Sequence, residues 1–205
     1  MRSAAFCCGL LLLVSGSGRA QDAAPGPSAS PLPEEFNGLF SSYCLEKFPD
    51  DAAVASAIAN NKLTKLAPQE ARLFVRSKGG GEGWIIQGAG GRYVLTAERP
   101  PYLACTIRHV VLKPFSTEAL NALADKFVAA KGNRLVDGSS TERPMGDGIA
   151  SAMSYRNEVD ARGVPTGEIF MFAVVGYPGA SPADSSQPKP FWEIRFSRVI
   201  LKSDT

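Results

Sequence analysis

The sequence predicts an α+β fold in which an antiparallel sheet carries N-terminal helices and one mid-chain helix packed on it. Apolar residues recur at helical spacing between residues 34 and 76, and again between residues 116 and 130. Elsewhere, short runs with alternating polarity are separated by glycine-rich turns, which is typical of strands. This order of helices, strands, one helix and further strands indicates an antiparallel sheet with helices on one side.

The N-terminus has the pattern of a secretory signal peptide, which we assign to residues 1–20. An apolar block of about eleven residues follows Arg2, and Gly18 and Ala20 occupy the −3 and −1 positions of a cleavage site. We therefore expect cleavage between Ala20 and Gln21. The block has about half of the ~20 apolar residues that a spanning helix needs, so we expect no stable membrane insertion after the signal is removed.

Residues 21–33 are mostly Ala, Pro, Ser and Gly, and we expect a flexible linker there. Residues 34–205 have the usual length of a single domain. Loss of residues 1–20 removes Arg2 and Arg19, so the 22 basic and 20 acidic residues of the chain become 20 of each. A neutral mature chain argues against nucleic acid or an anionic membrane as main partner, because both are held largely by excess Lys and Arg.

Two cysteines remain after the predicted cleavage, Cys44 and Cys105. We expect a disulfide bond between them, because a periplasmic or secreted chain folds where thiols oxidise. The alternative, a reactive thiol pair, lacks the Cys-x-x-Cys spacing of redox sites. A lipid anchor at Cys7 or Cys8 is not expected, because the apolar segment follows these cysteines instead of preceding them.

Three helices are expected before the first strand. The first, Glu34–Phe48, ends before Pro49. Its apolar stripe, which directs Cys44 to the core, consists of Phe36, Leu39, Phe40, Tyr43 and Cys44. A second, Ala-rich helix, residues 50–61, begins with Asp50 and Asp51, which the helix dipole favours in a first turn. A short third helix starts at Pro68.

Strands and one helix come next along the chain. A glycine turn joins two short strands, 84–87 and 93–96, into a hairpin. The next strand, 103–112, alternates: Thr106 and Arg108 lie on one face, and the inward face holds Leu103, Cys105, Ile107, His109 and Val111. The mid-chain helix, residues 116–130, has Ser116 as its expected N-cap.

The C-terminal part is predicted to be all strand, at residues 134–137, 149–156, 168–177 and 191–201. Residues 169–175 are apolar on both faces. We expect them to lie centrally in the sheet and to be covered by helices, since strands buried on both sides have this composition.

Candidate chemistry is sparse. His109 is the only histidine, so a mechanism with a histidine base must use it, but its apolar strand face favours a core or boundary residue. No metal site is predicted, because there is no second histidine to make the common ligand pairs. The glycine runs match neither nucleotide-binding motif, so no cofactor is expected. No catalytic residue is assigned.

Two features are candidates for a ligand or partner surface. Trp84 and Trp192 each begin a predicted strand, where they would line one end of the sheet, although core packing explains them equally well. The proline-rich segment 178–190 has a length at which loops are usually functional or disordered, and we favour disorder.

Aromatic and cysteine positions form a pattern between residues 36 and 111. Its motifs are Phe40-x3-Cys44-x3-Phe48-Pro49, Gly83-Trp84, Tyr93-x-Leu95, Pro101 and Cys105. This pattern resembles a family of small, exported, uncharacterised proteins and lipoproteins of Gram-negative bacteria. The resemblance implies an envelope location and paired cysteines, and it implies no particular activity. The chain departs from the lipidated members because it lacks a usable lipid-attachment cysteine.

We therefore expect an exported envelope protein that acts as a disulfide-stabilised binding or interaction module for a protein, a peptide or a small ligand. The alternative is a small periplasmic enzyme in which His109 is the general base and Arg108 or Arg99 holds an anionic substrate.

Overall fold

The computed structural model describes residues 32–146, 149–177 and 191–201. The predicted cleavage site at Ala20 and Gln21 and the segment 178–190 lie outside the described residues. The first helix begins at Leu32, within the last two residues of the predicted linker 21–33, and residues 21–31 also lie outside the described residues. Within the described part of the chain, no helix is long and apolar enough to cross a membrane.

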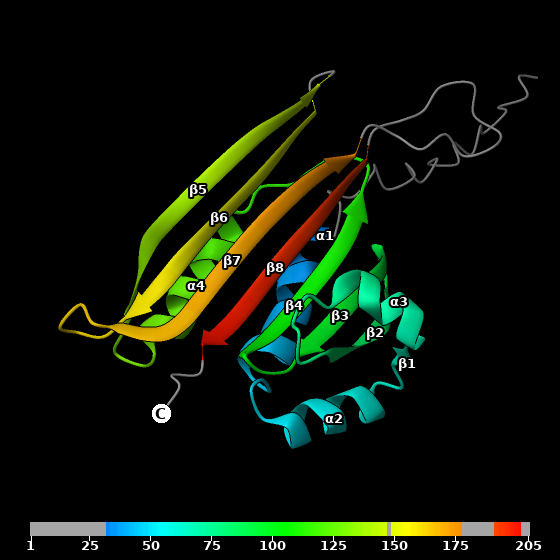
Figure 1. Cartoon of the computed structure of the whole chain (residues 1–205), viewed down its shortest axis with the longest axis horizontal. Helices are drawn as coiled ribbons and strands as arrows, with labels where there is room; N and C mark the ends of the chain where they lie inside the picture. The colour runs from blue at the N-terminus through cyan, green and yellow to red at the C-terminus, as the bar shows by residue number, and fades with distance from the viewer. Residues whose placement is uncertain (1–31, 147–148, 178–190, 202–205) are drawn as a thin grey trace, which may run out of the picture.

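Eight strands form one antiparallel sheet in the order β1-β2-β3-β4-β8-β7-β6-β5. Their bounds are Thr64–Lys65 (β1), Gly81–Gly88 (β2), Gly91–Glu98 (β3), Tyr102–Val111 (β4), Arg134–Gly146 (β5), Ile149–Val159 (β6), Pro165–Tyr177 (β7) and Phe191–Leu201 (β8). The last strand, β8, lies between β4 and β7 and joins the two halves of the sheet (Figure 1). The predicted α+β class with an antiparallel sheet is confirmed.

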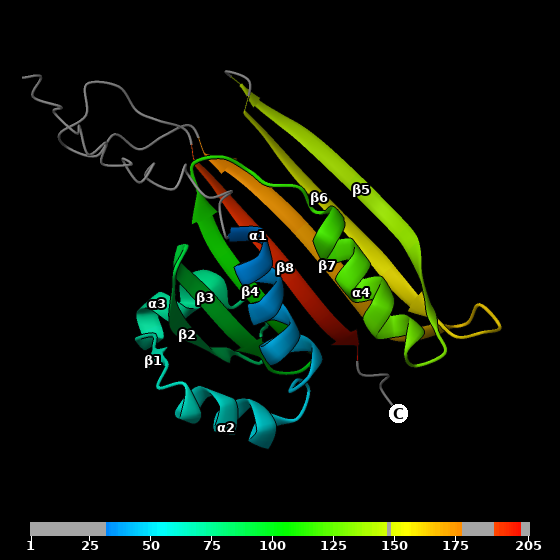
Figure 2. The same cartoon turned by 180° about the vertical axis from the view of Figure 1, so that it is seen from behind.

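The helices lie on both sides of this sheet but not equally. Their bounds are Leu32–Phe40 (α1), Ser41–Leu45 (η1, a π-helical turn), Asp51–Asn60 (α2), Pro68–Phe74 (α3) and Glu118–Ala129 (α4). Figure 2 shows α1 and α4 on the same face, which we call the helix-covered face. The short helix α3 lies on the opposite face, where Ala71 packs with Leu66 and Val94.

The main core lies between the sheet and the helices of the helix-covered face. Successive strand residues point to opposite faces, so every second residue of a strand enters this core. In β4 these residues include Cys105, Ile107 and Val111, as the alternation predicts. The ring of Phe40 from α1 packs on that of Phe196 from β8, with 4.2 Å between centroids.

A disulfide bond joins Cys44 of η1 to Cys105 of β4, as predicted. The two residues are 61 positions apart, and their Cα atoms lie 5.4 Å from each other. Both cysteines are buried in the main core. The bond therefore fastens the N-terminal helical segment to the middle of the sheet.

Arg198 holds the same segment from the neighbouring strand. It is the register partner of Cys105, on β8. One of its terminal nitrogens donates hydrogen bonds to the carbonyl oxygens of Cys44, Leu45 and Phe48, at 3.0, 3.2 and 2.7 Å. Carbonyls at the end of a helical segment have no partner in a following turn, so this guanidinium acts as their cap.

The strand β5 is the largest departure from the predicted elements. The sequence predicts a strand over 134–137 only, because the next residues are polar, whereas β5 continues to Gly146. It is an edge strand and pairs with β6 across a register shift after Asp137. Polar residues are tolerated there because an edge strand is open to solvent. Gly138 allows close packing, since a Cβ atom would lie 2.5 Å from Cδ2 of Tyr155.

Reduction of the disulfide is expected to lower the free energy of unfolding by up to about 4 kcal/mol, because the closed loop restricts the unfolded chain. Urea unfolding of the oxidised and reduced protein measures this difference. The control is Cys44→Ser with Cys105→Ser, in which reductant should change nothing further. Equal stability of oxidised and reduced wild type would contradict the prediction.

Arg198→Met is expected to cost about 3 kcal/mol or more, because it leaves three carbonyls without a donor and breaks a nearly buried pair with Glu168 (2.7 Å). The matched control is Arg156→Met, whose partners Asp125 and Asp137 are largely exposed, and for which about 1 kcal/mol or less is expected. Urea unfolding measures both variants, and equal losses would refute the special role of Arg198.

Candidate functional site

Strand residues that point away from the helix-covered face form what we call the open face, on β4, β8, β7 and β6. Figure 1 shows α3 over β2 and β3 on this side, with the next strands uncovered by the helices that the structure describes. Residues 169–175 lie inside the sheet, as expected, but the helices that the structure describes cover only one of their two apolar faces. Phe170 and Phe172 join the main core, whereas Met171 and Ala173 face the open side. The physical reason is that α1 and α4 both pack on one face.

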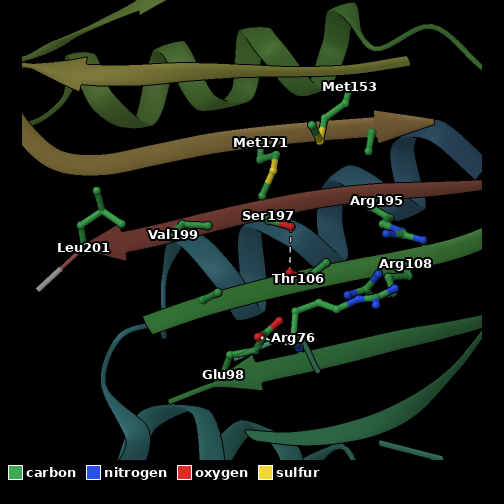
Figure 3. A pocket seen from close by; sticks show the side chains of 12 residues that line it. Arg76, Glu98, Thr106, Arg108, Met153, Met171, Arg195, Ser197, Val199 and Leu201 are labelled. Atoms are coloured by element: carbon green, nitrogen blue, oxygen red, sulfur yellow. Dashed lines mark hydrogen bonds between the residues drawn. The ribbon is translucent and has the colours of Figure 1, made fainter. Parts of the chain in front are cut away.

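The open face is hollowed into a cavity of about 400 Å³, which we call the trough (Figure 3). It is lined by Arg76, Glu98, Ala104, Thr106, Arg108, Met153, Met171, Ala173, Arg195, Ser197, Val199 and Leu201. Two large apolar side chains of the trough are exposed, Met153 at 42% and Leu201 at 47%. The volume is within the range of small-molecule sites, and the mixture of apolar walls with a few polar groups is typical of them.

Charged residues gather at one end of the trough. Arg108 and Arg195 are register partners on β4 and β8, so two cations stand directly opposite each other. Both pair with the carboxylate of Glu193, Arg108 at 3.2 Å and Arg195 at 2.5 Å, and Tyr177 donates its hydroxyl to the same carboxylate at 3.3 Å. Two guanidinium groups thus share one carboxylate, which leaves this cluster with an excess positive charge.

The electrostatics of the cluster depend on burial and on these pairs. Burial lowers the pKa of Arg108, and the neighbouring charge of Arg195 lowers it further. Burial alone would raise the pKa of Glu193, but hydrogen bonding and charge interaction with Arg195, helped by Arg108, lower it below its ordinary value. The buried Nε of Arg108 has no hydrogen-bond partner among the described residues. The charge of Glu98, the carboxylate that lines the trough beside these groups, acts in the opposite direction and raises the pKa of Arg108.

Arg76 enters the trough from the segment after α3. Its position is set by Glu98, whose carboxylate accepts hydrogen bonds from the backbone N–H groups of Arg76 and Ser77, at 2.9 and 2.6 Å. The Ser77 hydroxyl donates to the carbonyl of Arg99 at 2.5 Å and fixes the same segment. The carboxylate of Glu98 is thus engaged by the backbone, while the Arg76 side chain is exposed.

His109 lies on the helix-covered face and not in the trough. It is 4% exposed, its ring stacks on Tyr93 with 4.1 Å between centroids, and its Nδ1 donates to the carbonyl of Arg92 at 3.0 Å. Arg108 precedes it on β4 and therefore points to the other face. Tyr93 of β3 is the register partner of His109. Arg99 comes six residues after Tyr93, just beyond the end of β3, which is roughly 20 Å along the strand direction. The structure does not bring these arginines to His109.

The two tryptophans lie in the main core and do not form a common surface. Trp84 is 7% exposed, and Trp192 packs, partly buried, against the same cluster. Followed from strand to strand across the sheet, the residues paired with Trp84 lead to Phe196 on β8. Trp192 is four residues away from Phe196, which is about 13 Å along the strand. The structure instead gives both rings the core-packing role that the sequence also allows.

The trough was not identified as a site from the sequence, although two signals for it were present. One is the apolar character of residues 169–175 on both faces, and the other is Arg108 on the outward face of its strand. The partners Glu193 and Arg195 come from a strand about eighty-five residues later in the chain, so spacing alone does not reveal the cluster.

Stability should depend on Glu193 in a pH-dependent way. A carboxylate with a lowered pKa stabilises the fold above its unfolded value, which is 4.5 here, and this contribution is lost as the pH falls through the folded pKa. Glu193→Gln is expected to cost about 3 kcal/mol at neutral pH and progressively less below pH 4.5.

Thermal or urea unfolding from about pH 3 to pH 7 measures the difference between wild type and Glu193→Gln. The same substitution at Glu142, an exposed residue of the edge strand β5, is the control. A wild-type advantage that stays constant over this range would contradict the assigned role of Glu193.

Among the residues that the structure describes, no group of three or more His, Cys, Asp or Glu side chains is placed to hold a metal ion. The site that the fold builds is thus a cavity lined by apolar side chains, with arginines at one end. In comparisons with known proteins, no family model, curated protein or solved structure matches this chain.

Proposed function

We propose that this protein is an exported binding module that takes a small, largely apolar ligand in the trough of the open face. The observation that carries this proposal is the apolar open face itself. A strand that needs to bury only one face alternates in polarity, yet β7 keeps Met171 and Ala173 on the side that the described helices leave uncovered. Apolar surface of this kind is typical of ligand or partner sites.

Rigidity supports a binding role. The trough floor belongs to the central strands β4, β8 and β7, which pair along most of their length. Thr106 and Ser197 share a hydrogen bond of 2.8 Å across two of these strands (Figure 3). Preformed cavities bind small molecules at a lower entropic cost than flexible surfaces.

Export and oxidation support the same assignment. The disulfide between Cys44 and Cys105 is compatible with folding in an oxidising compartment, in line with the predicted signal peptide. It anchors η1, which follows α1, on the face opposite the trough. The bond thus contributes to a scaffold, and the trough is left free of the segment that it holds.

The test uses the neutral, apolar fluorescent probe phenylnaphthylamine with the native, oxidised protein. We expect saturable binding with increased probe fluorescence. Met153→Glu is expected to weaken binding about tenfold, because a charge at the rim of the trough opposes an apolar ligand. Since Met153 is 42% exposed, this substitution should leave the fold intact.

The matched control is Leu112→Glu, at an apolar side chain that is 74% exposed and outside the trough lining. It should leave the dissociation constant within about twofold of wild type. Absence of saturable binding to native wild type, or equal weakening by both substitutions, would reject the proposed site.

A further inference from the structure

We propose that the ligand of the trough is a single-chain amphiphile with a carboxylate head group, which binds at Arg108 and Arg195 while its chain runs along β8 towards Leu201. This inference rests on the proposed function and adds the chemical class of the ligand and its direction in the trough. Figure 3 shows the two guanidinium groups at one end of the trough and Leu201 at the other.

The head group is inferred from the missing negative charge. Arg108 and Arg195 face each other across two strands, a placement that is unfavourable for like charges. Glu193 supplies one carboxylate for the two cations. With Arg76 and Glu98, which also line the trough, three arginines stand against two carboxylates, so the carboxylate of a ligand would balance the one remaining positive charge. Guanidinium groups match the planar, two-oxygen geometry of a carboxylate.

Burial makes this arrangement more specific than a surface patch of arginines. The side chain of Arg108 is 6% exposed, and its Nε lacks a hydrogen-bond partner among the described residues. The terminal nitrogens of Arg108 donate to Glu193 and, at 2.6 Å, to the carbonyl of Phe74, so its positive charge is fixed in place and a ligand oxygen would make its direct contact at Arg195. Arg195 is 23% exposed at the same end of the trough, so the cluster is accessible from the cavity.

The other candidate carboxylate of the trough is already engaged. Glu98 accepts the backbone N–H groups of Arg76 and Ser77, which hold its carboxylate in the wall of the trough, and its charge offsets part of the positive charge there. The exposed side chain of Arg76 adds a third cation to the lining. The trough therefore favours an anionic ligand over a neutral or cationic one.

The path of the ligand's chain is inferred from the side chains that come after Arg195 on β8. Ser197, Val199 and Leu201 are the next residues on the same face, and they line the trough. Six residues of strand extend about 20 Å, which suits a long, flexible apolar chain. Met171 from β7 borders the same path, and methionine side chains adapt readily to such a chain.

Two other occupants fit these observations less well. A second copy of the protein would bring its own positive cluster to the open face in a symmetric pair, since a twofold interface uses the same patch on both subunits. An anionic membrane surface is bound by exposed basic clusters, whereas Arg108 is 6% exposed and Arg195 is 23% exposed.

The test is calorimetric titration of the oxidised protein with octanoate, dodecanoate, hexadecanoate and dodecanol, each below its aggregation concentration. We expect affinity to increase up to about fourfold for each added methylene that is buried. Dodecanol, which has the same chain without the charge, should bind at least about tenfold more weakly than dodecanoate.

Substitutions test which residues bind the head group of the ligand. Arg195→Met should weaken dodecanoate binding about tenfold and leave dodecanol within about twofold, and Arg195→Lys should restore part of the loss. The matched control is Arg162→Met, because this arginine is 84% exposed and lies outside the trough lining. Arg162→Met should change neither affinity. If Arg195→Met fails to fold, the four ligands on wild type decide the question.

The outcomes separate this inference from the proposed function. Equal binding of dodecanoate and dodecanol, with phenylnaphthylamine still bound, would overturn the carboxylate head group and leave the binding module standing. Failure of the neutral probe to bind would remove the proposed function as well. Binding to phosphatidylglycerol vesicles without binding of monomeric dodecanoate, or a stable dimer that excludes dodecanoate, would replace the amphiphile by a membrane or by a second copy.

Discussion

Two side chains that stand opposite each other on neighbouring strands hold the N-terminal helical segment in place. Cys105 of β4 is bonded to Cys44, and Arg198 of β8 donates to carbonyl oxygens of the same segment. One attachment is covalent and limits the unfolded chain, while the other is charge-assisted and caps carbonyls that a helix end leaves without partners. Together they fix residues 44–48 on the middle of the sheet.

This attachment holds η1, and α1 that leads into it, on the face of the sheet that α4 also covers. With α1, η1 and α4 on one face, the main core forms there, around rings such as Phe40 and Phe196. The opposite face has the seven-residue helix α3, which packs over β2 and β3. The apolar and basic side chains of β4, β8 and β7 on that face therefore line a cavity instead of a second core.

The local pattern of apolar and polar residues was sufficient to predict the elements in which buried and exposed residues alternate regularly. The bounds predicted for β8, 191–201, are those observed, and the alternation in β4 directs Cys105 and His109 inward as expected. The pattern failed at β5, because an edge strand open to solvent needs no apolar face and its polar residues resemble a loop. For the two tryptophans the pattern left both a surface position and a core position open, and the structure packs both rings in or against the main core.

The sequence by itself determined the α+β class and the inward residues of most strands, because both follow from the local spacing of apolar residues. It also determined the pairing of its two later cysteines, because these are the two that remain after the predicted cleavage. Only the tertiary structure decided which face of the sheet the helices cover. It also decided that Arg108 meets Glu193 and Arg195. The physical reason is that strand order and helix side are set by contacts between residues far apart in the chain, and no local spacing encodes them.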